Sequence, residues 1–409
     1  MQVYLVGGAV RDQLLNLPVH DRDWVVVGTT PQAMLDAGYQ AVGKDFPVFL
    51  HPTSKEEYAL ARTERKTGLG YTGFDCYFST EVTIEEDLMR RDLTINAIAQ
   101  DGQGHLIDPY HGVDDIKQRQ LRHVSDAFTE DPLRVLRVAR FAAKLHHLGF
   151  SVADETMDLM RQITLSGELN HLTPERVWQE WHKSLTTPTP HAFLEVLKNC
   201  GALAHVLPEI DALFGIPQPE KWHPEIDTGL HTLMVAKQAA QLSDSPLVRF
   251  AAQVHDLGKA VTPKEEWPSH KRHCHTGIKL IKALCNRLRA PNEFRDLALD
   301  VCQQHTNIHN ALQLKPATLV RLFNQLKLWR QPQRLEQVLL ACAADHKGRL
   351  GFENLEYRVA EYVTAAFHIA AQINAQDVIK DGFVGKDISE EQNRRRIAAV
   401  AKFKQEYVA

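Results

Sequence analysis

The spacing of hydrophobic and polar residues divides the chain into a mixed N-terminal part and a helical remainder. Short β-branched runs such as Gln2–Val6 and Val25–Val27 are typical of strands. Tyr58–Arg62 and His105–Pro109 are also predicted to be strands. From about residue 119 the pattern is helical almost to the end of the chain. The pattern therefore predicts an α/β head with a small mixed sheet, followed by mostly α-helical regions.

Proline-rich breaks subdivide the helical remainder. A helix is expected to start at Asp131–Pro132, because proline suits an early helical position and an acid favours the helix N-terminus. Thr186–Pro190 marks one break, and four prolines between residues 208 and 224 mark a stronger one. The predicted domains are a head (1–118), a helical neck and body (119–221), a histidine-rich helical domain (222–350) and a helical C-terminal tail (351–409).

Composition narrows the class of protein. The 409 residues are 44% hydrophobic and 24% charged, which is typical of a globular protein with a sizeable core. A net charge of −4 argues against a broadly basic nucleic-acid coat but is compatible with a local basic surface. The six cysteines form no close pairs, so neither a disulfide framework nor a cysteine-type zinc site is predicted. No targeting segment or membrane-length apolar run is present, and we expect a cytoplasmic protein with no membrane role.

A glycine pair precedes two closely spaced carboxylates near the N-terminus. Gly7 and Gly8 lie between a predicted strand and a predicted helix, where backbone N–H groups can face a phosphate. Asp21 and Asp23 would point to the same face of a strand and could together hold one or two Mg²⁺ ions. Each half alone also fits an ordinary turn or a surface Asp-x-Asp pattern. Their adjacency favours an enzyme that transfers nucleotides.

Two arginine-rich segments follow. In the first, Arg91 offers a guanidinium that can clamp phosphate oxygens, and Asp92 could accept from a ribose hydroxyl. In the second, Asp131 and Arg134 are three residues apart, so on a helix they share a face and offer acceptors and donors on one edge. Such an edge can imitate a Watson–Crick partner.

Two further arginines, Arg137 and Arg140, continue this row at helical spacing. A row of arginines near a triphosphate and a row of exposed ion pairs both fit this segment. Taken alone, it does not decide between them.

Histidines and acids in the helical domain suggest a second centre. His255 and Asp256 are adjacent, His231 precedes them and Asp345 follows at a distance. Histidine and carboxylate ligands from separate helices suit a divalent transition metal, whose bound water would attack a phosphoester. An isolated His-Asp pair is usually without function, but the ordered set is much more specific.

The combined motifs resemble bacterial class II CCA-adding tRNA nucleotidyltransferases, of the multifunctional type that also carries an HD domain. The resemblance extends over essentially the whole chain. The matching stretches of the head occur in family order and spacing: Leu5–Asp12, Asp21–Trp24, Arg90–Ala97 and Glu130–Phe141.

For the head, the resemblance implies that Asp21 and Asp23 hold the catalytic Mg²⁺ while the tRNA 3′-hydroxyl attacks the α-phosphate of CTP or ATP and pyrophosphate leaves. Asp131 and Arg134 would read the base edge. The helical neck and body would embrace the tRNA by shape. A loop used in the switch from C to A addition is expected within Lys66–Phe78. The implied nucleotide-binding residues are Gly8, Arg11, Arg91, Asp92, Asp131, Arg134, Arg137 and Arg140.

For the HD domain, the resemblance implies hydrolysis of 2′,3′-cyclic phosphates, 2′-nucleotides and phosphomonoesters, with a preference for Ni²⁺. Lys259 would bind a substrate phosphate. His275 and His305 fall where some HD proteins place ligands for a second metal, and His270, His273 and His309 lie nearby in the sequence. The implied ligands of the first metal are His231, His255, Asp256 and Asp345.

Three alternatives share parts of this pattern. A bacterial poly(A) polymerase carries the same head motifs, but usually with a basic C-terminal extension in place of an HD domain. A tRNA-binding protein with an inactive head and an HD-type nucleotide hydrolase with an accessory head are both disfavoured by the complete head motifs. The sequence leaves open whether the protein is a monomer or a homodimer, and whether a third carboxylate assists the aspartate pair.

Overall fold

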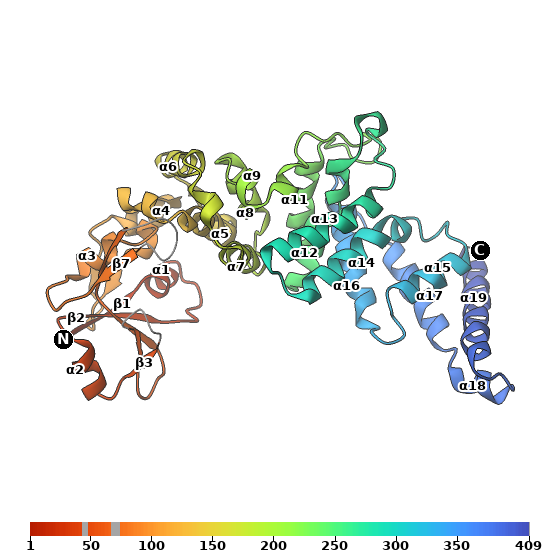
Figure 1. Cartoon of the computed structure of the whole chain (residues 1–409), viewed down its shortest axis with the longest axis horizontal. Helices are drawn as coiled ribbons and strands as arrows, with labels where there is room; N and C mark the ends of the chain where they lie inside the picture. The colour runs from red at the N-terminus through yellow and green to blue at the C-terminus, as the bar shows by residue number, and fades with distance from the viewer. Residues whose placement is uncertain (43–47, 67–73, 409) are drawn as a thin grey trace. The chain divides into compact units, whose positions relative to one another are not determined.

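The computed structural model describes residues 1–42, 48–66 and 74–408, and the chain divides into two compact units, Met1–Val206 and Leu207–Ala409 (Figure 1). The predicted boundaries at residues 118, 221 and 350 are a finer division and stay a prediction. The glycines of the predicted switching loop, Gly68, Gly70 and Gly73, lie outside the described residues. In the described ranges, every helix is too short or too polar to cross a membrane.

A seven-stranded sheet forms the centre of the first unit, in the order β3-β4-β5-β2-β1-β8-β9. Strands β2 and β5 are parallel, and the other neighbours are antiparallel. The predicted small mixed sheet is therefore confirmed. The strands are β1 (Gln2–Val6), β2 (Asp23–Val27), β3 (Gln40–Val42), β4 (Val48–Leu50), β5 (Glu57–Leu60), β8 (Ala99–Gln100) and β9 (Leu106–Ile107). Strands β6 (Thr63–Lys66) and β7 (Phe74–Tyr77) pair separately.

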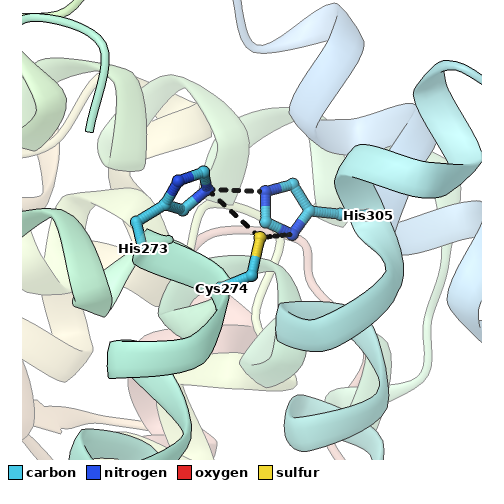
Figure 2. Close-up of side chains that lie close together, drawn as sticks. All are labelled: His273, Cys274 and His305. Atoms are coloured by element: carbon cyan, nitrogen blue, oxygen red, sulfur yellow. Dashed lines mark hydrogen bonds between the residues drawn. The ribbon is translucent and has the colours of Figure 1, made fainter. Parts of the chain in front are cut away.

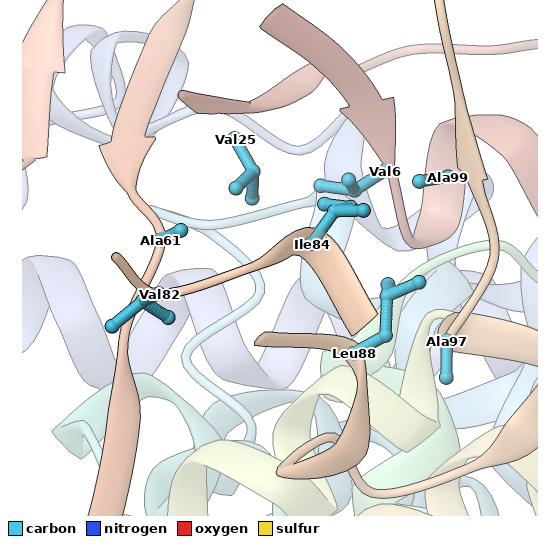
Figure 3. Close-up of a cluster of buried hydrophobic side chains, with 8 residues drawn as sticks. All are labelled: Val6, Val25, Ala61, Val82, Ile84, Leu88, Ala97 and Ala99. Atoms are coloured by element: carbon cyan, nitrogen blue, oxygen red, sulfur yellow. The ribbon is translucent and has the colours of Figure 1, made fainter. Parts of the chain in front are cut away.

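The sheet is apolar on both faces because successive side chains of a strand point to opposite sides. Val25 belongs to one core cluster and Val26 to the other. Helix α3 (Ile84–Met89) contributes Ile84 and Leu88 to the first cluster, and α2 (Pro31–Asp36) contributes Met34 to the second. Figure 3 shows the first cluster: Val6, Val25, Ala61, Val82, Ile84, Leu88, Ala97 and Ala99.

Helices complete the first unit. Helix α1 (Gly8–Leu14) follows β1 directly, and α5 packs against both α7 and α8. Two short parallel strands, β10 (Gln120–Leu121) and β11 (Ser151–Val152), interrupt the helical pattern that the sequence predicts from residue 119. The remaining helices are α4 (Gly112–Gln118), α5 (Leu133–Leu145), α6 (Asp154–Leu165), α7 (Pro174–Leu185), α8 (His191–Asn199) and α9 (Leu203–Val206).

The regular secondary structure described in the second unit is helical, as predicted, apart from one isolated bridge between Pro217 and Asp227. Helix α14 packs against α12, α13 and α16, and α11 packs against α12 and α16. These five helices all lie within the predicted histidine-rich domain (222–350). The helices are α10 (Pro208–Asp211), α11 (Thr228–Leu242), α12 (Pro246–Val254), α13 (His273–Leu288), α14 (Asn292–His309), α15 (Pro316–Gln325), α16 (Gln333–Lys347), α17 (Val359–Ala371), α18 (Ala375–Lys380) and α19 (Lys386–Val408).

Candidate functional site

The glycine turn between β1 and α1 lies against two guanidinium groups, and the missing Cβ of Gly7 makes room for one of them. Gly7 has a φ of 69°, in the left-handed region that favours glycine. A Cβ on Gly7 would lie 2.8 Å from Nη1 of Arg91, and a Cβ on Gly8 would lie 3.6 Å from Nη2 of Arg11. The turn therefore holds two cations close to the backbone, where an anionic substrate could approach.

Arg11 is engaged by its own neighbours. Its guanidinium is buried and donates to Asp12 at 2.8 Å and to the side-chain oxygen of Asn96 at 2.5 Å. It also lies 5.2 Å from the ring centre of Phe141 on α5. Lys144, also on α5, donates to the second carboxylate oxygen of Asp12 at 2.9 Å. In this structure Arg11 ties α1 to α5 and to Asn96, and we keep its contact with a nucleotide as a prediction.

The two predicted metal-binding aspartates lie at the start of β2. Asp23 pairs with Val6 of β1 and with Glu57 of β5. Asp21 lies before the strand and is exposed. The prediction that both carboxylates lie on a strand is therefore wrong for Asp21, because pairing with β1 reaches only to Asp23. Both residues nevertheless line one cavity of about 810 Å³, which we call the aspartate cavity.

Neighbouring charges affect the ionisation of this pair. Burial raises the pKa of Asp23, Arg91 lowers it, and repulsion from Asp21 raises it, with an upward net shift. A divalent cation between two carboxylates relieves such repulsion. Glu56 and Glu57 line the same cavity. The structure thus brings further carboxylates next to the pair, which the sequence alone did not reveal.

A second cavity of about 400 Å³ brings together five of the eight predicted nucleotide-binding residues, and we call it the arginine cavity. Six of its lining residues are arginines and two are aspartates, an excess of positive charge that suits a polyphosphate. Arg62 and Arg176 were missed by sequence reasoning, because they come from segments with no recognisable motif. The lining residues are Arg62, Arg90, Arg91, Asp92, Asn96, Asp131, Leu133, Arg134, Arg137, Phe141 and Arg176.

Buried aspartates fix these arginines in place. Asp87 on α3 accepts from Arg90 at 2.8 Å and from Arg91 at 3.2 Å. Although burial raises it, the two arginines hold the pKa of Asp87 below its usual value. Asp92 accepts from Arg137 at 2.6 Å, so the carboxylate predicted to meet a ribose hydroxyl already binds a protein donor. Asp87 was not identified from the sequence.

The predicted base-reading pair does not share a helix face. Asp131 has extended backbone angles, and α5 begins only at Leu133. The prediction that Asp131 is helical was wrong, because a residue that precedes a proline avoids the helical conformation and Asp131 precedes Pro132. Asp131 accepts from the backbone N–H of Leu133 at 3.0 Å, and its other oxygen lies 3.4 Å from Nη2 of Arg176. Arg134 is buried and donates to two backbone carbonyls, yet both residues line the arginine cavity.

The arginine row on α5 divides between two roles. Arg137 lines the arginine cavity. Arg140 pairs with Glu180 of α7 at 2.5 Å and lies 4.4 Å from the ring centre of Phe141. The structure therefore places Arg140 in a contact between helices and does not place it among the lining residues of this cavity.

The second centre lies within the unit Leu207–Ala409 and is built from several helices. His231 comes from α11 and Asp345 from α16, and their Nε2 and Oδ1 atoms are 3.0 Å apart. Nδ1 of His231 lies 2.9 Å from Glu225, which orients the ring. His255 and Asp256 follow α12, with Nε2 of His255 3.2 Å from Oδ2 of Asp256. The structure thus brings the four predicted ligands together, all of them buried.

The donor set fits a divalent metal ion. Nδ1 of His255 donates to the carbonyl of Ala252 at 2.8 Å, which leaves Nε2 as the ring nitrogen that can bind a metal ion. Among the described residues, this buried Nε2 and Oδ1 of Asp256 have no hydrogen-bond partner. Although burial lowers it, Asp256 and Asp345 raise the pKa of His255 well above its usual value, so the surroundings favour a cation. Lys259 lies 2.6 Å from Oδ2 of Asp256, within reach of a substrate held at this centre.

The remaining histidines correct one prediction. His305 on α14 joins the centre, and its ligand atom lies within 4.8 Å of those of His255 and Asp345. His275 is exposed and does not belong to any of the described metal-binding groups. His273, two residues earlier on α13, takes the place expected of His275: its Nε2 is 3.4 Å from Oδ1 of Asp256. The prediction of His275 as a ligand is therefore not supported.

A close glycine contact sets the position of His273. A Cβ on Gly258 would lie 1.9 Å from the carbonyl oxygen of His273 and 2.7 Å from the backbone nitrogen of Gly277. We expect Gly258→Ala to push α13 away and to lower the midpoint of thermal unfolding by about 6 °C, since overpacking of this kind costs about 2 kcal/mol. Gly102→Ala, where the space is open, is the control. Equal midpoints for the two variants would contradict this interpretation.

Three family models match the chain. Residues 3–122 match the Poly A polymerase head domain, residues 149–214 the probable RNA and SrmB-binding site of polymerase A, and residues 228–347 the HD domain. The first match contains the aspartate cavity, and the third contains the four buried ligands of the second centre.

Curated relatives and solved structures agree with these matches. A "Multifunctional CCA protein" of Vibrio cholerae serotype O1 is 70% identical over 400 residues, which are 98% of this chain and 99% of the relative. The crystal structure of the Bacillus stearothermophilus CCA-adding enzyme in complex with CTP is 25% identical, with a TM-score of 0.62 over 98% of this chain and 89% of that one. The Thermotoga maritima CCA-adding enzyme complexed with tRNA_CCA, at 20% identity, has the same fold, with a TM-score of 0.64 over 98% and 87% of the two chains. The head, the HD domain and the identity along nearly the whole length show that this chain belongs to the multifunctional CCA proteins.

Proposed function

We propose that the head adds C, C and A to the 3′ end of tRNA from CTP and ATP. The observation that carries this proposal is the pair of cavities in one unit, one with Asp21 and Asp23 and the other with six arginines. Mg²⁺ held by the two aspartates would activate the attacking 3′-hydroxyl and neutralise the negative charge of the leaving pyrophosphate. The arginine cavity would bind the triphosphate through Arg91 and Arg137.

Selection of the base would rest on Asp131 and Arg134. The carboxylate of Asp131 offers an acceptor beside Arg176, and the guanidinium of Arg134 is held by backbone carbonyls. Fixed donors and acceptors can discriminate bases without a nucleic-acid template, since an unpaired polar group in a closed site is costly. Gly8, Arg11, Asp92 and Arg140 are also proposed to bind the nucleotide, and the contacts described above would hold Arg11, Asp92 and Arg140 in position.

The helical neck and body, residues 119–221, would hold the tRNA. Residues 149–214 match a probable RNA-binding model, and the Thermotoga maritima enzyme of this fold is complexed with a tRNA. Recognition by shape and backbone suits an enzyme that accepts every tRNA. The cytoplasm, where tRNA is processed, is the proposed place of this activity.

For the HD centre we propose phosphoester hydrolysis on 2′,3′-cyclic phosphates, 2′-nucleotides and phosphomonoesters. His231, His255, Asp256 and Asp345 would hold a divalent ion, with Ni²⁺ as the proposed metal because imidazole ligands suit it. The ion would lower the pKa of a bound water, and Lys259 would hold the substrate phosphate. We further propose that hydrolysis at the HD centre trims a damaged tRNA end, which the head then extends.

An incorporation assay tests the head. The protein is incubated with tRNA that lacks its 3′-terminal CCA, together with labelled CTP, ATP and Mg²⁺. The proposal expects two C residues and one A, followed by a stop. A long A tail would instead identify a poly(A) polymerase. No incorporation alongside intact hydrolysis would identify an HD hydrolase with an accessory head.

A further inference from the structure

The HD centre contains a buried neutral side chain that has no role in the function proposed above. Gln218 lies in the segment between α10 and α11, with only 2% of its surface exposed. Its side-chain oxygen accepts a hydrogen bond from Nζ of Lys259. Its side-chain nitrogen, Nε2, is buried and has no hydrogen-bond partner among the described residues. A buried donor without an acceptor costs free energy, so this position calls for an acceptor that arrives with a ligand.

The chemistry of Lys259 fixes which end of the amide faces it. An ammonium group can only donate hydrogen bonds, so the oxygen of Gln218 must face Nζ and the nitrogen must be the end that lacks a partner. The oxygen and nitrogen of one amide are about 2.3 Å apart, which places Nε2 within about 5 Å of Nζ. A single oxygen atom can accept from two donors at this separation, through hydrogen bonds of about 2.8 Å. The two side chains can therefore hold one phosphate oxygen together.

The segment that carries Gln218 is fixed by contacts within the same unit. The backbone N–H of Gln218 donates to the carbonyl of Ile226 at 2.7 Å. The carbonyl of Pro217 accepts from Nε2 of His270 at 2.6 Å. The same segment contains Glu225, which lies 2.9 Å from Nδ1 of a proposed metal-binding histidine. These contacts make the segment part of the HD centre and hold Gln218 in place.

The side of the centre at Lys259 differs in chemistry from the opposite side of Asp256. Oδ2 of Asp256 lies 2.6 Å from Nζ of Lys259. Oδ1 lies 3.4 Å from Nε2 of His273 and 3.7 Å from Nε2 of His305, and Figure 2 shows these two imidazoles pointing toward one another from α13 and α14. Lone pairs of imidazole suit a cation, whereas an ammonium N–H and an amide N–H suit an anion. The anionic part of a substrate therefore fits best beside Lys259 and Gln218.

We propose that Gln218 is a phosphate-binding residue of the HD centre, which donates through Nε2 to the substrate oxygen held by Lys259. This inference deepens the proposed hydrolysis of phosphomonoesters and cyclic phosphates and rests on it. A neutral donor adds a hydrogen bond without adding a second positive charge, which would repel a metal ion at Asp256. A glutamine in a loop belongs to no recognisable motif, so only its contact with Lys259 identifies it.

Two substitutions separate the two ends of the amide. Gln218→Glu keeps an oxygen for Lys259 but replaces the N–H donor by a second oxygen. Gln218→Met has a similar length and removes both polar atoms. Both variants should raise the KM for a 2′-nucleotide and the inhibition constant of inorganic phosphate about tenfold or more, because each loses a hydrogen bond to a charged group.

Binding of inorganic phosphate can also be measured without turnover. Ni²⁺ held by histidine and carboxylate ligands is paramagnetic and broadens the ³¹P resonance of a phosphate bound beside it. The full-length protein is loaded with Ni²⁺, while excess Mg²⁺ occupies the aspartate cavity. The phosphate dissociation constant obtained from this broadening should be about tenfold or more higher in both variants than in the wild type. Nickel should stabilise both variants against thermal unfolding as much as the wild type, since Gln218 is not a proposed metal ligand.

Lys221→Gln is the matched control. Lys221 lies in the same segment with an exposed side chain, and its substitution changes the charge of the segment by the same amount as Gln218→Glu. Charge at an exposed position is screened by water and salt, so the KM and the phosphate constants should stay within about twofold of the wild type.

The outcomes separate this inference from the proposed hydrolysis. Weaker phosphate binding in Gln218→Met alone would mean that Gln218 only positions Lys259, and weaker binding in Gln218→Glu alone would reflect the added charge; either result overturns the proposed role. Wild-type phosphate binding in both variants, or a loss of nickel stabilisation in both, also overturns it and leaves the hydrolysis in place. If both variants lose phosphate binding but the wild type hydrolyses no phosphoester, the proposed hydrolysis fails and the phosphate-binding role stands.

Discussion

Asp23→Asn is expected to reduce nucleotide addition by about a thousandfold or more while hydrolysis at the HD centre continues. Asparagine has the shape of aspartate, so the backbone pairing of Asp23 with Val6 and Glu57 is kept. The substitution removes a negative charge and a strong metal-binding oxygen from the aspartate cavity. Asp21 alone, in the segment before β2, would then have to hold the ion. Incorporation of labelled CTP and ATP into tRNA, measured beside cyclic-phosphate hydrolysis, gives both activities.

Glu56→Gln is the matched control for this experiment. Glu56 lines the same cavity, but its carboxylate accepts from Nε1 of Trp24 at 3.0 Å and lies 3.7 Å from Arg22. Loss of such a partly exposed ion pair costs about 1 kcal/mol or less, so incorporation should stay within about fivefold of the wild type. If Asp23→Asn retained more than about a tenth of the activity, a factor worth only 1.4 kcal/mol, the metal-binding role would be wrong.

The sequence predicts the strand framework of the head well because that framework is encoded locally. The run Gln2–Val6 coincides with β1, and Val25–Val27 lies within β2. β-Branched residues that alternate between two apolar faces leave little choice of secondary structure. The position of Asp21 outside β2 could not be predicted from the local sequence, because the end of a strand depends on where its neighbour stops pairing.

The sequence does not predict whether His273 or His275 faces the metal centre. His273 and His275 flank Cys274 at the start of α13, and residues two apart on a helix point in widely different directions. The rotation of α13 decides between them. The packing of α13 against α14 and against Leu257–Val261, which contains Gly258, fixes that rotation, and the spacing of histidines does not encode this packing.

Contacts between distant segments account for the other differences. Arg140 has helical spacing from Arg137, yet Glu180 of α7, 40 residues later, pairs with it. Arg176 reaches Asp131 from the same helix, and no local pattern indicates this. By contrast, the extended conformation of Asp131 follows from the proline after it and could have been predicted by giving that local rule more weight than the helical spacing.

Asp256→Asn is expected to abolish hydrolysis, by about a thousandfold or more, while nucleotide addition continues. One oxygen of Asp256 lies beside His255 and Lys259 and the other faces His273, so the substitution weakens the hold on metal on both sides. Metal binding has a separate measure. At a Ni²⁺ concentration about one hundred times its dissociation constant, the ion should stabilise the wild type by about 2.7 kcal/mol. Asp256→Asn should show little of this gain in thermal unfolding.

His275→Ala is the control for this second experiment, because its side chain is exposed on the same helix as His273 and lies outside the described metal-binding groups. It should keep hydrolysis, nickel stabilisation and nucleotide addition. Full hydrolysis by Asp256→Asn would remove the HD centre as the hydrolytic site. The structure supports two independent sites, because each is assembled from residues of one unit: the aspartate and arginine cavities from Met1–Val206, and the metal ligands from Leu207–Ala409. Loss of nucleotide addition in a folded Asp256→Asn protein would contradict this independence.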